Sequence, residues 1–217
     1  HGNVYANLYR NVEFPEDVKI LTLQYKIRNK NLTSSSWGPA VLLYWNNLDA
    51  IGLRLSTIST EKGYYRIEVG NLKRLGMTDG LITPGDTWAE VKIVVDNLSF
   101  HVYLYCRNIG DQDWTLVYDD TYPNARFFSS PPQGIVIGTG YTASMDSAPY
   151  LRNSYSSPGS YGRVYFDDIQ IKADDKVIFF ENFETSMDGL ALNYDIASDP
   201  ANPEPVFQVT QLGKESK

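Results

Sequence analysis

Four polar or aromatic side chains occur at every second position of one short stretch, in a pattern that suits ligand binding. His101, Tyr103, Tyr105 and Arg107 interleave with apolar residues. Alternate residues of a β-strand point to the same side of a sheet, so these four are expected to share one face. Proteins recognise sugars with aromatic side chains, which stack on the apolar faces of the sugar rings, and with arginine, which forms hydrogen bonds to the sugar hydroxyls. Together with Trp114 they are the candidate ligand-binding residues, the alternative being a solvated strand face with no ligand.

The elements that must position these side chains are predicted to be strands. Residues 21–28, 65–69 and 91–95 also alternate between apolar and polar side chains, which indicates half-buried strands. Turn-forming Gly, Pro, Asn and Asp residues separate the runs, and no segment shows apolar residues at helical spacing. We therefore predict an all-β protein, an antiparallel β-sandwich of the jelly-roll type. Residues 141–161 are rich in Ser, Gly, Pro and Tyr and are expected to form a long loop, either functional or merely exposed.

Composition narrows the function classes. The 217 residues carry a formal charge of −7, and there is no Lys/Arg-rich run. Binding to nucleic acid or to an anionic membrane begins with cationic side chains, so neither partner is expected. No apolar run approaches the roughly 20 residues that span a bilayer, so membrane insertion is not expected either. The non-Met start indicates a mature secreted chain or an excised fragment. The single cysteine, Cys106, excludes an internal disulfide and is interpreted as a small buried apolar residue.

Five segments together resemble the concanavalin A-like, laminin-G-like jelly-roll domains. They are Trp37–Trp45, Gly63–Gly70, Trp88–Asp96, Val102–Tyr105 and Tyr165–Ile171. In that family a Trp-x-x-Val-x-Ile strand precedes a strand with a Val-Tyr pair, and the closing strand commonly reads Phe/Ile-Asp-Asp-Ile/Val. The resemblance covers about residues 2–173 and implies two curved antiparallel sheets packed face to face. It is specific to a fold and not to an activity.

The strand that usually opens such a domain is out of place in this chain. The family commonly begins with Phe-Glu-x-Phe-Glu, whereas here Phe179-Phe-Glu-Asn-Phe-Glu184 follows the closing strand. The chain therefore resembles a circularly permuted member of the family. We predict a jelly-roll body over residues 1–173 and a C-terminal segment over residues 174–217 that supplies the missing opening strands.

A sandwich that lacks its first strand would leave unpaired backbone groups beside its core. The C-terminal segment can fill this slot within its own chain, in a neighbouring subunit, or as the opening of a following repeat, and the sequence leaves all three open. The apolar residues predicted to make this contact are Phe179, Phe180, Phe183, Val206, Phe207 and Val209.

Acidic residues near the closing strand make structural calcium a second expectation. Domains of this family often hold calcium between the opening and closing strands, which implies Asp167, Asp168 and Glu184 as ligands. Carboxylate oxygens are what calcium selects. The alternation of the strand also breaks at Asp167-Asp168, and a β-bulge there would turn one carboxylate sideways. The alternative is a solvated acidic turn.

Three kinds of catalytic site occur on β-sandwiches and can be compared with this sequence. Glucan hydrolases of this fold place Glu-x-Asp-x-x-Glu on one strand, and that motif is absent. Lyases of the fold use a His or Tyr with Arg and Gln in the groove, for which His101, Tyr103, Tyr105 and Arg107 are candidates. A copper centre of the polysaccharide monooxygenase type would need the N-terminal His1 with a second histidine, and His101 is the only other one.

The sequence thus predicts an extracellular or cell-surface module without a catalytic centre. The leading hypothesis is self-association with copies of itself or with adjacent repeats through the C-terminal segment. The alternative is a carbohydrate-binding module that uses the face around Tyr103, Tyr105 and Arg107, with glycans as partners.

Overall fold

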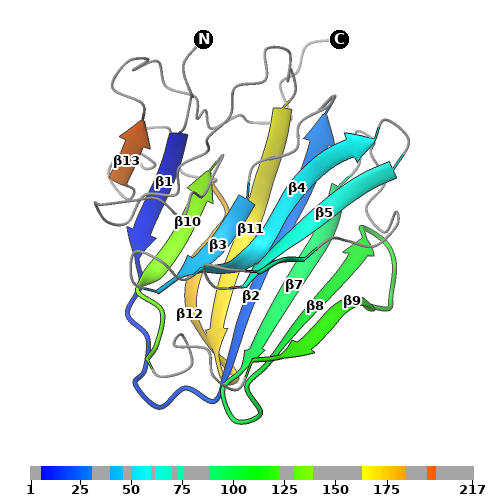
Figure 1. Ribbon diagram of the computed structural model, residues 1–217. Helices are drawn as coiled ribbons and strands as arrows, with labels where there is room; N and C mark the ends of the chain where they lie inside the picture. Colours follow the sequence, from blue (N-terminus) through cyan, green and yellow to red (C-terminus); the bar gives the residue numbers. More distant parts are fainter. Residues whose placement is uncertain are drawn as a thin grey trace.

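The computed structural model describes residues 6–30, 40–45, 50–59, 62–69, 73–75, 88–122, 130–138, 163–183 and 195–198. These residues form thirteen strands and no helix. The strands build two antiparallel sheets that lie one in front of the other (Figure 1). The predicted all-β antiparallel sandwich is confirmed. Within the described ranges no helix is long and apolar enough to cross a membrane.

Seven strands form the sheet in front in Figure 1. Their order across the sheet is β13 (Asp195–Ser198), β1 (Ala6–Asn11), β10 (Gly134–Gly138), β3 (Ala40–Tyr44), β4 (Ala50–Ser59), β5 (Lys62–Val69) and β6 (Lys73–Leu75).

Six strands form the other sheet, in the order β12 (Lys176–Glu181), β11 (Arg163–Ala173), β2 (Ile20–Lys30), β7 (Trp88–Asp96), β8 (His101–Asn108) and β9 (Thr115–Thr121). Strands far apart in the chain are neighbours here: β2 pairs with β11 on one side and with β7 on the other. This pairing arises because the chain passes repeatedly from one sheet to the other, for example from β1 to β2 and from β2 to β3. Connections of this kind are typical of a jelly roll.

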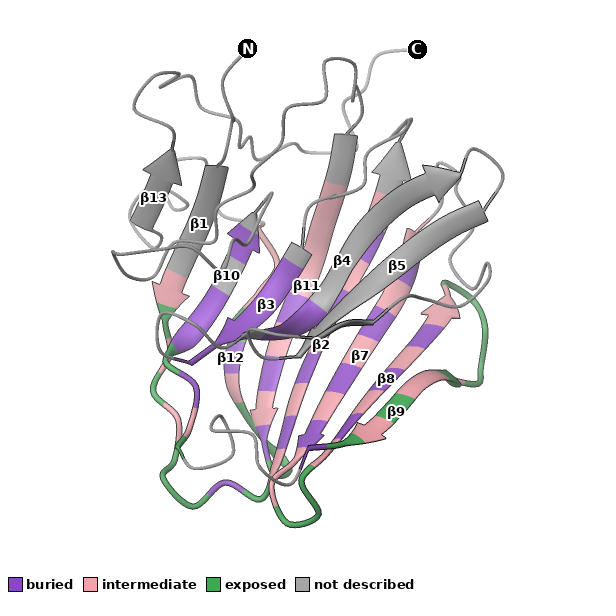
Figure 2. Cartoon of the chain, in the orientation of Figure 1, coloured by how far each residue is buried: buried purple, intermediate pink, exposed green. Residues whose placement is uncertain are grey.

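The hydrophobic core lies between the sheets and follows the alternation of the sequence. Along β2, β7 and β8 every second residue is buried, and the residues between are half-buried, which Figure 2 shows as bands across these strands. Val41 to Trp45 are all buried, so both faces of β3 are covered. Cys106 is 2% exposed on the inner face of β8, and burial raises the pKa of its thiol to about 12. The interpretation of Cys106 as a core residue is confirmed.

One edge strand of each sheet comes from the C-terminal part of the chain. β12 pairs with β11, and β13 pairs with β1 at the edge of the other sheet, both within one chain. Phe179 is buried, Phe183 packs against the core, and Phe180 is 53% exposed. Val206, Phe207 and Val209 lie outside the described residues. The division at residue 173, the displaced opening strand and the exchange of strands between subunits stay predictions.

Candidate functional site

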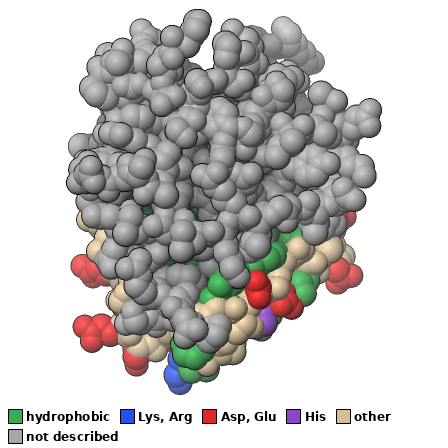
Figure 3. All heavy atoms as spheres, viewed as in Figure 1, with side chains coloured by type: hydrophobic (Ala, Val, Ile, Leu, Met, Phe, Trp, Pro, Cys, Tyr) green, Lys and Arg blue, Asp and Glu red, His purple; other side chains and the backbone are tan. Residues whose placement is uncertain are grey.

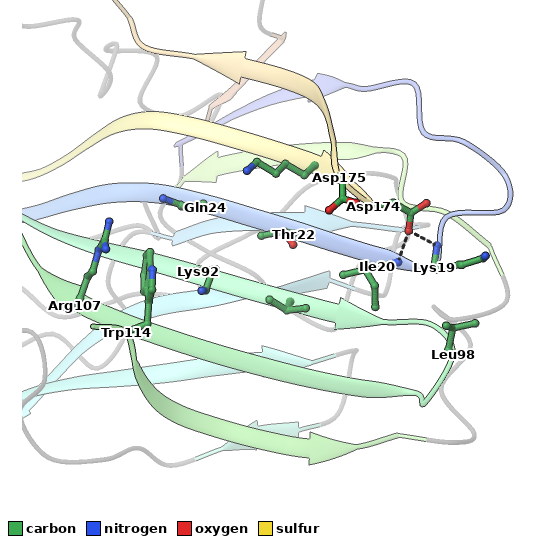
Figure 4. Close-up of a pocket in the computed structure, with 12 residues that line it drawn as sticks. Lys19, Ile20, Thr22, Gln24, Lys92, Leu98, Arg107, Trp114, Asp174 and Asp175 are labelled. Carbon is green, nitrogen blue, oxygen red and sulfur yellow. Dashed lines mark hydrogen bonds between the residues drawn. The ribbon is translucent and has the colours of Figure 1, made fainter. Parts of the chain in front are cut away.

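An open groove with a volume of about 900 Å³ runs over the outer face of the six-stranded sheet (Figure 4). It extends from the centre of β2, β7 and β8 to the turn between β11 and β12. The described residues that line it are Lys19, Ile20, Thr22, Gln24, Lys92, Val94, Leu98, Arg107, Trp114, Lys172, Asp174 and Asp175.

Strand register explains why these side chains meet. Gln24 lies opposite Gln170 of β11 and Lys92 of β7, and Lys92 lies opposite Tyr105 of β8. Residues opposite one another in antiparallel strands point to the same face. Because the other side of each strand faces the core, this polar row is left on the outside.

Trp114 connects two cations at one end of the groove. It lies in the loop before β9, and its ring centroid is 4.3 Å from Nζ of Lys92 and 4.4 Å from Cζ of Arg107. Figure 4 shows the indole between the two side chains. The ammonium of Lys92 also lies 4.6 Å from the Tyr105 ring. Cation–π contacts of this kind hold the positive groups in place without neutralising them.

An aromatic row along β8 continues from this cluster. The rings of His101 and Tyr103 stack with centroids 4.3 Å apart, and those of Tyr103 and Tyr105 are 6.3 Å apart. Of the five predicted ligand-binding residues, Arg107 and Trp114 line the groove, and the other three lie on the same sheet face beside it. The rings stack on one another and Lys92 lies over Tyr105, so part of their ring surface is already covered.

His101 is engaged through both ring nitrogens. Nε2 lies 2.8 Å from Oδ1 of Asp119, and Nδ1 lies 3.2 Å from Oγ1 of Thr121. His1, the other histidine of the copper interpretation, lies outside the described residues.

The carboxylate of Glu90 partly compensates the charge on Arg107, whereas no described carboxylate pairs with Lys92. Arg107 Nε donates to Oε2 of Glu90, which is 13% exposed, and Nη1 donates over 3.4 Å to the carbonyl of Gln112. Lys92 takes part in none of the ion pairs found among the described residues. Partial burial lowers the pKa of Lys92, and the nearby positive charges of Arg107 and Lys172 lower it further. Both effects disfavour the charged ammonium while no anion is bound.

The opposite end of the groove is built on Asp174. Its Oδ1 accepts hydrogen bonds from the backbone amides of Lys19, at 3.1 Å, and Ile20, at 2.9 Å, drawn as dashed lines in Figure 4. The amide of Asp174 in turn donates to the carbonyl of Ile20 over 2.7 Å. Asp174 has a φ of 52°, in the left-handed region that aspartate tolerates better than most residues. Asp174 therefore joins the β11–β12 turn to the start of β2.

The residues proposed for calcium are only partly within the described ranges. The pairing of β11 with β2 shifts register between Asp167 and Gln170, so the expected bulge is present, and Asp168 has a φ of 49°. The bulge turns the Asp168 carboxylate onto the ammonium of Lys26, and this hydrogen bond raises the pKa of Lys26. A lysine there opposes a bound cation, and the described residues contain no cluster of three possible metal ligands. Glu184 lies outside the described residues, so calcium binding stays a prediction.

Several groove residues were not singled out from the sequence. Thr22, Gln24, Lys92 and Lys172 all come from the polar positions of alternating strands, and that signal marks them only as outward-facing. Their convergence depends on the order β11-β2-β7-β8, which no local pattern encodes.

The chain matches no protein-family model and no curated protein. Among solved structures it is similar to domains LG4-5 of the mouse laminin alpha1 chain, with 17% identity and a TM-score of 0.45 over 86% of this chain and 45% of that one. It is also similar to the CBM2 module of the Lactobacillus casei BL23 phage J-1 evolved Dit, with 11% identity and a TM-score of 0.44 over 76% of this chain and 67% of that one.

A third similar structure is the Ruminococcus gnavus IT-sialidase CBM40 bound to α2,3-sialyllactose, with 12% identity and a TM-score of 0.38 over 81% of this chain and 83% of that one. The chain spans less than half the length of the laminin structure. Structural similarities with TM-scores of 0.38–0.45 identify neither a family nor a ligand.

Proposed function

We propose that this chain is a carbohydrate-binding module that holds a glycan against the outer face of its six-stranded sheet. An extracellular or cell-surface location is part of the proposal, because long glycans are found there. The observation that carries it is the open groove of about 900 Å³, lined by hydrogen-bonding side chains from several strands. This volume is in the range of small-molecule sites, about 300–1,000 Å³.

The groups in the groove suit sugar hydroxyls. Gln24 offers both a donor and an acceptor, Thr22 offers a hydroxyl, and Trp114 adds an apolar edge and an N–H donor. Sheet strands hold these groups at set spacings, so little ordering is needed on binding.

The arrangement favours binding over catalysis. The two carboxylates of the described lining, Asp174 and Asp175, are adjacent in one turn, and Asp174 accepts two backbone hydrogen bonds. Acid–base cleavage of a glycosidic bond uses two carboxyl groups on opposite sides of the bond, about 5–9.5 Å apart.

Affinity gel electrophoresis against a panel of soluble polysaccharides tests this proposal. We expect at least one polysaccharide to retard the wild-type chain, and Gln24→Ala and Trp114→Ala to reduce the retardation. Ile109→Ala is the matched control, because Ile109 is 50% exposed in the β8–β9 turn and does not line the groove. Retardation by no member of the panel would contradict the proposal, as would unchanged retardation of both groove variants.

A second candidate function, self-association through β12, rests on a separate observation. Among the described residues this strand has a partner strand on one side only, and it exposes Phe180 at 53% and Val177 at 45%. A free edge strand with apolar side chains is a surface on which another strand can pair.

Light scattering over a concentration series, coupled to size-exclusion chromatography, tests self-association. We expect wild-type oligomers that Phe180→Lys abolishes. Leu116→Lys is the control, since Leu116 is 46% exposed on β9 at the other edge of the same sheet. A wild-type chain that is monomeric at every concentration rules this function out.

A further inference from the structure

The distribution of charge in the groove is opposite to that of the whole chain. The formal net charge is −7, and acidic side chains outnumber basic ones on the described part of the face seen in Figure 3. The described lining of the groove, in contrast, contains four cationic side chains and two anionic ones. The cations are Lys19, Lys92, Arg107 and Lys172. A local excess of positive charge on an acidic protein attracts anions to that place rather than to the surface as a whole.

The two carboxylates do little to neutralise the cations around Trp114. Asp174 and Asp175 lie at the end of the groove formed by the β11–β12 turn, away from Arg107 and Trp114 (Figure 4). Asp174 also has its Oδ1 taken by the amides of Lys19 and Ile20. The groove is thus polarised along its length: Lys92, which forms no ion pair with a described residue, lies at the Trp114 end, away from the two carboxylates.

Lys92 is the cation at the Trp114 end of the groove that contacts two aromatic rings. Its ammonium lies between the rings of Tyr105 and Trp114, at 4.6 and 4.3 Å, and it has no carboxylate partner among the described residues. A partly desolvated ammonium without a counter-ion is an unfavourable arrangement in the free protein, and a bound anion would relieve it. The fall in the Lys92 pKa, caused by burial and by Arg107 and Lys172, has the same physical origin.

Arg107 is the second cationic side chain at this end of the groove, next to Trp114. Glu90 occupies Nε and the Gln112 carbonyl approaches Nη1, whereas no described residue accepts a hydrogen bond from Nη2. Trp114 separates Arg107 from Lys92 and contacts both, which holds the two like charges at a set spacing. Cationic side chains held in this way lose less conformational entropy when an anion binds than mobile surface lysines do.

We propose that the groove is specific for acidic glycans, with Lys92 binding a carboxylate or sulfate group of the sugar beside Trp114 and Arg107 adding positive charge on the other side of the ring. This inference rests on the proposed carbohydrate-binding function and adds the chemical class of the ligand. Carboxylate and sulfate present the same chemistry, a compact anion with several acceptor oxygens. The net charge of −7 disfavours nucleic acid, whose binding depends on many simultaneous phosphate contacts.

Isothermal titration calorimetry with paired oligosaccharides tests the proposal. Oligogalacturonides carry carboxylates, and their methyl esters are the same sugars without the charge. Carrageenan oligosaccharides carry sulfates, and their desulfated forms are the neutral counterparts. We expect at least one acidic member to bind about tenfold or more tightly than its neutral counterpart. Which pair shows the difference identifies the anion.

Variants of Lys92 test whether this residue binds the anionic group of the ligand. Lys92→Gln is expected to weaken the acidic ligand about tenfold or more, to leave the neutral counterpart little changed, and to make binding less sensitive to salt. Lys92→Arg keeps the charge and is expected to retain most of the affinity. Lys176→Gln is the control, since Lys176 lies at the start of β12 outside the groove and is exposed.

The outcomes separate this inference from the proposed function. Equal affinity for charged and neutral counterparts, or Lys92→Gln binding the acidic ligand like the wild type, overturns the inference and leaves glycan binding intact. Binding to no oligosaccharide of either kind, together with no retardation by the polysaccharide panel, overturns both. Far-ultraviolet circular dichroism of each variant confirms that a loss of binding is not a loss of fold.

Discussion

The ammonium of Lys92 lies 4.3 Å from the centroid of the Trp114 ring, and the two residues come from different elements, β7 and the loop before β9. This contact places the positive charge of Lys92 against the indole ring of Trp114 in the groove. Arg107 lies 4.4 Å from the same ring. Trp114 therefore organises the cationic end of the groove more than it offers a free ring face to a sugar.

Affinity for an acidic glycan should depend on pH through Lys92. Burial, together with the charges of Arg107 and Lys172, lowers the Lys92 pKa below its ordinary value of 10.5. A lysine is charged below its pKa, so the affinity should fall as the pH rises, and the fall should begin at a lower pH than for an ordinary lysine. Calorimetric titrations with the acidic oligosaccharide at several pH values measure this. The Lys92→Arg variant stays charged, and an equal decline in that variant would show that another group is responsible.

Replacement of Trp114 by leucine should affect stability slightly and binding strongly. Two cation–π contacts at partly exposed positions are each worth about 0.5–1 kcal/mol, so Trp114→Leu should lower the free energy of unfolding by about 1–2 kcal/mol. Trp114→Phe retains a ring and should lose less. Urea denaturation gives the stabilities and calorimetry the affinities. Identical behaviour of the leucine and phenylalanine variants would mean that the ring's contacts with the cations contribute nothing.

Asp174 should matter for stability because it connects the β11–β12 turn to the start of β2. Asp174→Ala removes the acceptor of two backbone hydrogen bonds, of 3.1 and 2.9 Å, and leaves a β-carbon at a φ of 52°. We expect a loss of about 1–2 kcal/mol in the free energy of unfolding. Asp174→Asn keeps an acceptor and tolerates this backbone conformation, so it should lose less.

The neighbouring Asp175→Ala serves as the control for this series, and we expect it to change stability by less than about 0.5 kcal/mol. Urea denaturation midpoints provide the comparison. A loss for Asp175→Ala as large as that for Asp174→Ala would assign the effect to charge in the turn rather than to the two hydrogen bonds.

The thiol of Cys106 should be unreactive in the folded chain. It is 2% exposed, and burial raises its pKa to about 12, so almost no thiolate is present near neutral pH. Iodoacetamide labelling followed by mass spectrometry should show an unmodified chain under native conditions and complete modification in urea. Rapid labelling of the native protein would place Cys106 at the surface instead.

Much of the fold could be predicted because the alternation of side chains is a local property of a strand. The buried and outward residues of β2, β7 and β8 follow the sequence pattern, and the break at Asp167-Asp168 coincides with a shift in register. The candidate site was predicted only in small part. Arg107 and Trp114 line the groove, whereas Lys92 was not singled out although it lies on an equally regular strand. One strand's pattern contains no information about which strand will lie beside it.

The amino-acid sequence alone determined that this protein is built from strands, which face of each strand is buried, and that Cys106 belongs to the core. These properties depend on neighbours within a few residues, where a period of two decides the side to which each residue points. Only the tertiary structure decided that Lys92, Arg107 and Trp114 meet, and that Asp174 joins β11 to β2. Those contacts arise when strands distant in the chain pair side by side, and it is the packing of the two sheets around a common core that selects the pairs.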